Sequence, residues 1–213
     1  MLDKEANMNL KGLEVSALDE SEVEEALDVV ARGMRDNPLH LAAYGEDPER
    51  RLRKVHRFVS AAFAVKDFSS HTLVARRGDG RIVGVCGMLP PGDCLPTLGE
   101  KLRMMPRLLS NGPRAIGRVM RWLGVWDKHH PKERHWHLGP VAVDAHLQGM
   151  GVGSELMRTF CERMDIAGED AYLETDKELN VRFYERFGFE VISEEEVLGV
   201  PNWFMLRRRD QEG

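Results

Sequence analysis

The sequence predicts one α/β domain built on a mixed β-sheet, and three patterns indicate this fold class. Strand-like and helix-like segments alternate through the second half of the chain, a strand-turn-strand pattern stands in the first half, and a glycine-dense turn over 148–153 separates a predicted strand from a predicted helix. Hairpins make antiparallel pairs, and a helical connection makes a parallel pair. We therefore expect a mostly antiparallel central sheet with one parallel pair and with helices on both faces.

The first half of the chain predicts a strand, two helices and a hairpin. Ser21 and Glu24 predict a capping box at the start of the first helix, which ends near Asn37-Pro38 because a residue before proline avoids the helical conformation. Asp47-Pro48 predicts the start of the second helix, with proline in its first position. The predicted elements are a strand over 10–18, a helix after Ser21, a helix over 47–65, and strands over 71–76 and 81–89.

Two further helices are predicted between the third and fourth strands, as a helical insertion at about 93–132. Their apolar residues recur at helical spacing on both sides of Asn111-Gly112-Pro113, at Leu98, Leu102, Met105, Leu109, Ile116, Met120 and Leu123. We expect these stripes to pack in the core. The alternative is a lid over an apolar substrate pocket, because flexible thioether side chains suit adaptable surfaces.

The C-terminal part predicts the most regular alternation of strands and helices. Gly188 stands where a helix end favours glycine. The predicted elements are a strand over 135–144, a helix over 150–166, a strand over 171–175, a helix over 180–187, and strands over 189–198 and 202–208. We expect a single domain that spans residues 1–213.

Composition and charge disfavour several functional classes. The formal net charge of −5 gives no support to nucleic-acid binding. No apolar run approaches the ~18 residues of a membrane span, and the N-terminus has no signal-peptide core, so we expect no membrane association. The scattered cysteines Cys86, Cys94 and Cys161 are typical of a reduced compartment, and we expect a cytoplasmic protein.

The glycine-dense turn predicts a phosphate-binding site, because the amides at a helix start are unpaired and carry partial positive charge. A P-loop would need a lysine that is missing here. Gly149-x-Gly151-x-x-Ser154, with Glu174 further on, is a near match to a dinucleotide fingerprint. The turn lies too late in the chain for the second half of such a fold, which leaves another phosphate-bearing cofactor.

Two motifs resemble those of the GCN5-related N-acetyltransferase (GNAT) superfamily. The first is Gln148-x-x-Gly151-x-Gly153 after a strand, and the second is Asn180 followed by Tyr184-x-x-x-Gly188-Phe189. The insertion and the segment Leu173-Glu174-Thr175 are similar to the branch that contains puromycin N-acetyltransferase. The resemblance implies the acyl-CoA N-acyltransferase fold, in which two parallel strands splay apart, with acetyl-CoA as co-substrate and no metal.

The same resemblance implies where acetyl-CoA binds. Its pyrophosphate would lie on the amides of residues 149–154, and its pantetheine arm would pair with the strand backbone at 141–143. Pro140 would mark an irregularity in that strand, or else an edge strand without a role. Asn180 would contact the cofactor or cap its helix. The predicted cofactor-binding residues are Val141, Ala142, Val143, Gln148, Gly149, Met150, Gly151, Val152, Gly153, Ser154 and Asn180.

Acetyl transfer to an amine needs a base for the ammonium proton and an acid for the leaving thiolate. Tyr184 matches the family's acid, and its alternative role is aromatic packing. Glu174, at the end of a short apolar strand, is the first candidate base or amine-binding group, and His137 is the second. The histidines around His137 raise the possibility of a metal, but no cysteine joins them in sequence, so we predict none.

We therefore expect an N-acetyltransferase that moves an acetyl group from acetyl-CoA to a primary amine of a small molecule. The segment 36–40 and the insertion would line the acceptor pocket, and the chain's acidity favours a cationic acceptor. The alternatives are acetylation of a protein or peptide, and a non-catalytic acyl-CoA-binding regulatory domain. The two C-terminal strands would suit a homodimer.

Overall fold

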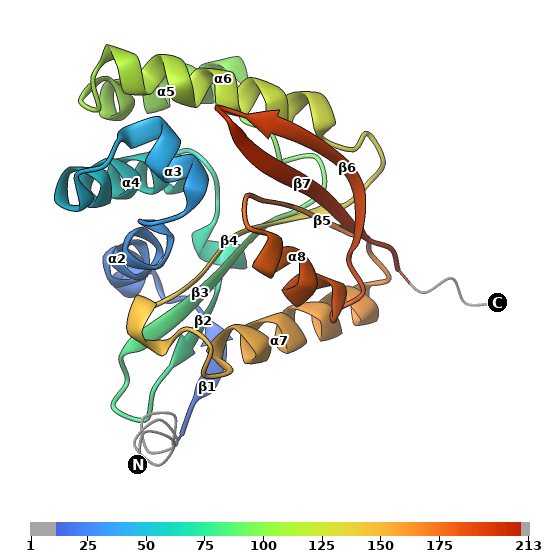
Figure 1. Ribbon diagram of the computed structural model, residues 1–213. Helices are drawn as coiled ribbons and strands as arrows, with labels where there is room; N and C mark the ends of the chain where they lie inside the picture. The colour runs from blue at the N-terminus through green and yellow to red at the C-terminus, as the bar shows by residue number, and fades with distance from the viewer. Residues whose placement is uncertain (1–11, 210–213) are drawn as a thin grey trace.

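The computed structural model describes residues 12–209 and contains a seven-stranded sheet with the order β1-β2-β3-β4-β5-β7-β6 (Figure 1). Every neighbouring pair is antiparallel except β4 and β5, which confirms the predicted mixed sheet. The predicted lead-in over 1–9 and the start of the first predicted strand lie outside the described residues. The strands are β1 Glu14–Ala17, β2 Leu73–Arg76, β3 Ile82–Leu89, β4 Trp136–Val143, β5 Ala171–Thr175, β6 Glu190–Val197 and β7 Val200–Arg207.

Helices cover both faces of the sheet, as predicted, and α5 and α6 lie between β3 and β4 in the chain. In Figure 1 they lie at the top of the molecule, while α7 lies at the bottom. The helices are α2 Val23–Met34, α3 Pro38–Tyr44, α4 Pro48–Phe63, α5 Leu98–Leu109, α6 Pro113–His129, α7 Val152–Ala167 and α8 Glu178–Glu185. Short 3₁₀ turns are η1 Glu20–Glu22, η2 Ser69–His71 and η3 Ala145–Leu147.

Two hydrophobic cores lie on opposite faces of the sheet. The first packs α2, α3, α4 and α6 against the sheet, and its buried residues include Leu27, Val30, Leu39, Val59, Val85 and Trp122. The second packs α7 and α8 against the other face, with Leu138, Leu156, Phe160, Leu173, Phe189 and Met205 among its members. Each fully buried large apolar side chain contributes roughly 1.5–3 kcal/mol. The two cores therefore cover β4 on both of its faces, with Ala142 in the first core and Leu138 in the second.

The structure corrects the predicted start of the first helix. The capping box is formed by Asp19 and Glu22, not by Ser21 and Glu24. The Asp19 carboxylate accepts a hydrogen bond from the Ser21 amide at 2.8 Å, and the chain then passes through η1 before α2 begins. Asp19 has the extended backbone that a cap needs, and serine two positions later is already inside the turn.

Helix α3 was not predicted. Pro38 separates it from α2, but a proline that ends one helix is also well suited to the first position of the next. Asn37 has no side-chain cap bond. The carboxylate of Asp176 instead accepts a hydrogen bond from the Leu39 amide at 2.7 Å. A residue far away in sequence thus caps α3, and local sequence does not show it.

The apolar stripes of α5 and α6 do not face the core as predicted. Leu98, Leu102 and Leu109 are 75%, 63% and 59% exposed. The buried residues of α5 are Met104 and Leu108, which pack around Ala61 of α4. On α6 the buried residues are Ala115, Val119 and Trp122. Most of each stripe is therefore offset from the face that packs on the protein, although Leu123 of α6 is half-buried against the first core.

Strands β4 and β5 are hydrogen-bonded neighbours only at their beginnings. Trp136 pairs with Ala171 and His137 pairs with Tyr172, and no register continues beyond them among the described residues. From Leu138 onward, β4 keeps β3 on one side and leaves its other edge without a strand partner. The splayed parallel pair implied by the resemblance is therefore present, and it opens at His137.

The sheet ends at β6, not at β7, which bears on the expected homodimer. The exposed or half-exposed edge strand carries Glu190, Glu194, Glu195 and Glu196. Repeated like charges on an edge strand disfavour pairing with a second copy of the same edge. A dimer through the C-terminal strands remains a prediction.

Candidate active site

The glycine-rich turn leads from β4 into the start of α7. Gly149 and Gly151 have φ values of 77° and 95°, which side chains with a Cβ rarely adopt. Their amides make no hydrogen bond within the described part of the chain. Val152 and Gly153 stand in the first turn of the helix, where amides have no intrahelical partner. Four amides without a hydrogen-bond partner among residues 12–209 thus lie close together in sequence at the start of α7, which suits an anion.

Close backbone contacts fix this turn in place. Gly84 of β3 lets α7 approach, since a Cβ there would lie 2.8 Å from Val152 Cγ1. Gly33 of α2 lets that helix approach β4, since a Cβ there would lie 2.5 Å from the Val143 carbonyl oxygen. The Gln148 side-chain amide donates to the Val143 carbonyl at 3.1 Å and to the Gly33 carbonyl at 3.3 Å. The Gln148 side chain therefore holds the turn, and sequence reasoning missed both glycines.

The strand before the turn has an irregularity at Pro140. The register of β3 and β4 shifts between Cys86 and Met88, opposite the Gly139-Pro140 segment. A Cβ on Gly87 would lie 2.8 Å from Pro140 Cδ, so glycine is needed there. Beyond the shift, the residues from Val141 to Val143 pair with β3 and present their other edge to the slot. This agrees with the predicted position for an extended pantetheine arm.

His137 and Glu174 form an ion pair where β4 and β5 separate. His137 Nε2 lies 2.8 Å from Glu174 Oε2, and the Glu174 side chain is only 4% exposed. Burial alone would lower the pKa of His137, but the charge and hydrogen bond of Glu174 outweigh it, and the pKa is raised. Sequence reasoning ranked these residues as alternative bases, whereas the structure joins them into one pair.

Tyr184 and Asn180 project from α8 toward the same region. Tyr184 is buried, and its hydroxyl makes no hydrogen bond within the described residues. Burial raises the pKa of Tyr184, so the phenol stays protonated. Asn180 lies inside α8, because the helix begins at Glu178, and its Nδ2 donates to Thr175 Oγ1 at 3.1 Å. The expectation that Asn180 caps this helix is therefore wrong.

One cavity of about 590 Å³ brings the predicted catalytic residues together. His137, Glu174, Tyr184 and Asn180 line it, as does Val141. From the segment 36–40, Asn37, Leu39 and His40 line it as well, as expected. The glycine-rich turn does not border this cavity. The phosphate end and the reacting end of the predicted site are thus separate, joined by the open edge of β4.

Two lining residues were missed by sequence reasoning. Asp176 follows β5 directly and is buried, with its carboxylate on the Leu39 amide. Lys66 is buried after α4, and its ammonium lies 2.5 Å from Asp93 Oδ1 and 3.1 Å from Glu100 Oε2. An acidic residue after a short strand was the available signal for Asp176. No sequence signal pointed to Lys66, because its two partners lie in a distant loop and helix.

A cysteine does join the histidines next to this site, which corrects the sequence argument. Ligand-type atoms of Cys94, His130 and His135 lie within 4.8 Å of one another. His130 Nε2 and His135 Nε2 are 3.1 Å apart, and the Cys94 thiol lies 3.5 Å from the Pro90 carbonyl. Burial lowers the pKa of His130 to about 4 and raises that of Cys94. The two histidines bond each other, while the Cys94 thiol donates to backbone carbonyls and not to the rings.

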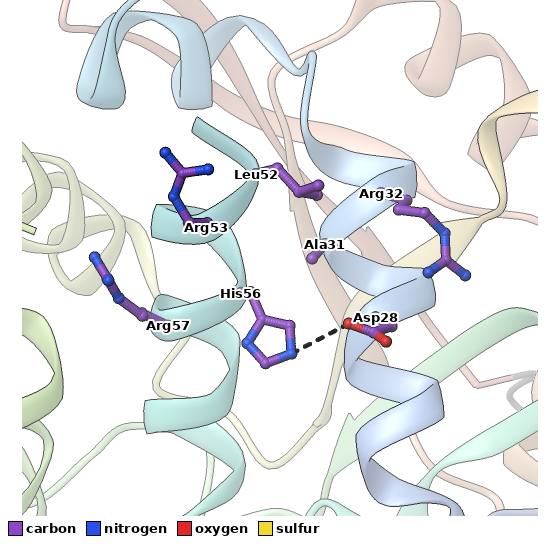
Figure 2. Close-up of a pocket in the computed structure, with 7 residues that line it drawn as sticks. All are labelled: Asp28, Ala31, Arg32, Leu52, Arg53, His56 and Arg57. Atoms are coloured by element: carbon purple, nitrogen blue, oxygen red, sulfur yellow. Dashed lines mark ion pairs between the residues drawn. The ribbon is translucent and has the colours of Figure 1, made fainter. Parts of the chain in front are cut away.

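A second, shallower cavity lies between α2 and α4 (Figure 2). Its lining is largely basic, with Arg32, Arg53, His56 and Arg57, and His56 Nε2 lies 3.4 Å from Asp28 Oδ1. None of these residues borders the larger cavity. The predicted catalytic residues therefore belong to the larger cavity alone.

Comparison with known families identifies a match to this architecture. The model of the acetyltransferase (GNAT) family matches residues 38–189, a range that contains β4, the glycine-rich turn and α8. The finer resemblance to the puromycin branch is not tested by this match and remains a prediction. No helix in the described range 12–209 has the length and apolarity to cross a membrane.

Solved structures share the fold at low sequence identity. A histone acetyltransferase HPA2 and related acetyltransferase from Corynebacterium glutamicum has a TM-score of 0.70 at 22% identity, covering 93% of this chain and 97% of that one. Arylalkylamine N-acetyltransferase 2 from Aedes aegypti has a TM-score of 0.65 at 14% identity, and the match covers 93% of this chain and 100% of that one. Polyamine N-acetyltransferase from Drosophila melanogaster has a TM-score of 0.60 at 16% identity, and the match covers 92% of this chain and 99% of that one.

Proposed function

We propose that this chain, which belongs to the acetyltransferase (GNAT) family, moves the acetyl group of acetyl-CoA to the primary amine of a small molecule. Acetyl-CoA is the acetyl donor of the family, which requires no metal. The observation that carries the proposal is the meeting of His137, Glu174 and Tyr184 at one cavity, where β4 and β5 separate. The amine acetyltransferases that share the fold support an amine acceptor.

The cofactor would bind along β4. The free amides of the glycine-rich turn would hold the pyrophosphate, since they combine unpaired donors with the positive end of α7. The pantetheine amides would pair with the open edge at 141–143 and bring the thioester toward Tyr184. Asn180 borders the cavity beside this path and is free to offer its side-chain oxygen to the cofactor.

The His137–Glu174 pair would accept the proton of the incoming ammonium. An alkyl ammonium with a pKa near 10.4 is only about 0.1% free amine at neutral pH. Glu174 would hold the ammonium by charge, and the proton would pass to the pair and then to water. Burial lowers the pKa of His137, but the charge and hydrogen bond of Glu174 outweigh it and raise the pKa, so the imidazole is the group of the pair that would take the proton.

Tyr184 would protonate the leaving sulfur. The amine nitrogen attacks the thioester carbonyl carbon, the C–N bond forms, and the C–S bond breaks with its electron pair on sulfur. The thiolate takes the Tyr184 proton, and the proton released by the acetylated nitrogen restores the phenol. Because the pKa of Tyr184 is raised, the phenol holds its proton until the thiolate forms.

Thiol release from acetyl-CoA tests the proposal, with arylalkylamines, polyamines, aminonucleosides and peptides as acceptors. We expect amine-dependent release that Tyr184→Phe lowers by about 100-fold or more in kcat, with little change in CoA affinity by calorimetry. Tyr44→Phe is the matched control, because it removes an equally buried, unpaired hydroxyl that does not border the cavity.

Three outcomes are informative. Full turnover by Tyr184→Phe would overturn the assignment of the acid. Release with peptides alone would favour protein acetylation over small-molecule acetylation. Tight CoA binding without release for any amine would favour the non-catalytic alternative.

A further inference from the structure

We propose that the acceptor amine carries a bulky apolar body, aromatic or long-chain alkyl, that occupies the cavity beneath α5 and α6. This inference rests on the proposed function, because it names the class of amine that the same site takes. It excludes polyamines and peptides as preferred acceptors.

The size and lining of the cavity carry the inference. Its volume of about 590 Å³, which the acceptor would share with the thioester end of the cofactor beside Val141 and Tyr184, falls within the range of roughly 300–1,000 Å³ that is usual for ligands of drug size. Beyond the catalytic residues, the lining is mostly aliphatic, aromatic and thioether side chains from α4, α5 and α6, including Phe58, Phe63, Met105, Trp122, Leu123 and Trp126. Transfer of a methyl group or phenyl ring from water into this cavity is favourable. Transfer of a polar chain is unfavourable, because the chain loses its hydration.

The two lysines that line the cavity are already paired. Lys66 is held between Asp93 and Glu100, and Lys101 Nζ lies 3.2 Å from Asp127 Oδ2. Asp176 accepts the Leu39 amide. Glu174 is the carboxylate beside the thioester path, with His137 as its partner. The lining carboxylates without a lysine or arginine partner in the described part of the chain, Glu174 and Asp176, both stand at the C-terminal end of β5. A second ammonium further along the cavity, beneath α5 and α6, would therefore be buried without a free counter-charge.

Exposed apolar side chains extend the cavity to the surface. Leu95, Leu98, Leu102 and Met120 line it and are 40–75% exposed. Apolar residues that both border a cavity and face water form a rim that an apolar ligand can cover. This explains most of the offset of the apolar stripes on α5 and α6, since five of their seven residues line the cavity and its mouth, namely Leu98, Leu102, Met105, Met120 and Leu123.

A chain-length series tests this preference directly. Linear 1-aminoalkanes from butylamine to decylamine, with phenylalkylamines, are compared with diamines of equal carbon number in the thiol-release assay. We expect kcat/KM to rise about fourfold per added methylene, which corresponds to ~0.8 kcal/mol per buried CH₂. The matched diamine should fall below its monoamine by more than about tenfold.

Substitutions on α5 locate the effect. Leu102→Gln should lower kcat/KM for octylamine by about fivefold and leave butylamine almost unchanged, because only the longer chain reaches the rim. Leu109→Gln is the control, since Leu109 is 59% exposed on the same helix but does not line the cavity. An equal loss in both variants, or for both amines in Leu102→Gln, would overturn the inference.

Binding separates failure of this inference from failure of the proposed function. Calorimetry with octylamine and CoA measures occupancy without turnover. Octylamine binding that weakens in Leu102→Gln, without thiol release for any amine, would refute the proposed function and support the apolar site. Faster turnover of diamines, polyamines or peptides would support the proposed function and refute the apolar site. If no amine is turned over and octylamine binding does not depend on chain length, both the proposed function and the apolar site are refuted.

Discussion

The cofactor side and the acceptor side of the molecule use apolar helices in different ways. On α7, the apolar repeat Val152, Leu156, Phe160 and Met164 is fully buried against the sheet. On α5, the repeat Leu98, Leu102 and Met105 borders a cavity, while Met104 and Leu108, which line the same cavity, also make the packing contact with α4. An apolar stripe therefore shows that something apolar covers it, without showing whether that is protein or ligand.

The cofactor side depends on backbone conformation more than on side chains, and Gly151→Val tests this with the largest expected effect. Gly151 has a φ of 95°, so valine would force the turn to rearrange and would misalign the free amides. We expect CoA affinity to fall by more than about 100-fold, a loss of about 2.7 kcal/mol, in calorimetry. The fold should persist, because a Cβ at this position meets open space.

Gly153→Ala is the matched control for the same turn. Gly153 lies in the first turn of α7 without a positive φ, and a Cβ there would meet Phe183 at an ordinary 3.5 Å. We expect CoA affinity to stay close to that of the unchanged protein. Similar losses in both variants would mean that space above the turn matters, not its backbone conformation.

The next test compares how much the two faces of α5 contribute to the free energy of unfolding. Met104 is 6% exposed, so Met104→Ala should lower the free energy of unfolding by about 2–3 kcal/mol. Leu98→Ala should change it by less than about 0.5 kcal/mol, because Leu98 is 75% exposed. Denaturant titration measures both. A large loss in Leu98→Ala would make that stripe part of the core and would remove the contrast between α5 and α7.

The strand, turn and helix of the cofactor side could be predicted from the sequence because each of these features is local. The glycine-dense turn, the strand before it and the helix after it can all be predicted from neighbouring residues of the sequence. Gly149 and Gly151 then have the positive φ that such a turn uses. The predicted sheet, with its parallel pair and its inserted helices, was correct for the same reason. Tyr184 and Asn180 were predicted from their match to a family motif, and the structure places both on α8.

The acceptor side could not be predicted because its contacts join distant segments. Asp176 caps α3, Lys66 meets Asp93 and Glu100, and Cys94 approaches His130 and His135. None of these pairs has a regular spacing that a motif could reveal. The pairing of His137 with Glu174 likewise depends on the register of two parallel strands, so sequence alone left them as rival candidates.

The pH dependence of turnover tests whether His137 and Glu174 act as a pair, with the smallest expected effect. Since Glu174 raises the pKa of His137, kcat/KM should rise with pH through a midpoint above the ordinary histidine value of about 6.5, as the pair loses its proton and becomes a base. Glu174→Gln removes the charge that raises this pKa and leaves the burial that lowers it, so the midpoint should move down. Glu195→Gln is the control, because Glu195 bonds a different histidine, His129, at 2.5 Å outside the cavity. An unchanged midpoint in Glu174→Gln, or an equal shift in Glu195→Gln, would show that the titrating group is not this pair and that the acceptor side takes its proton elsewhere.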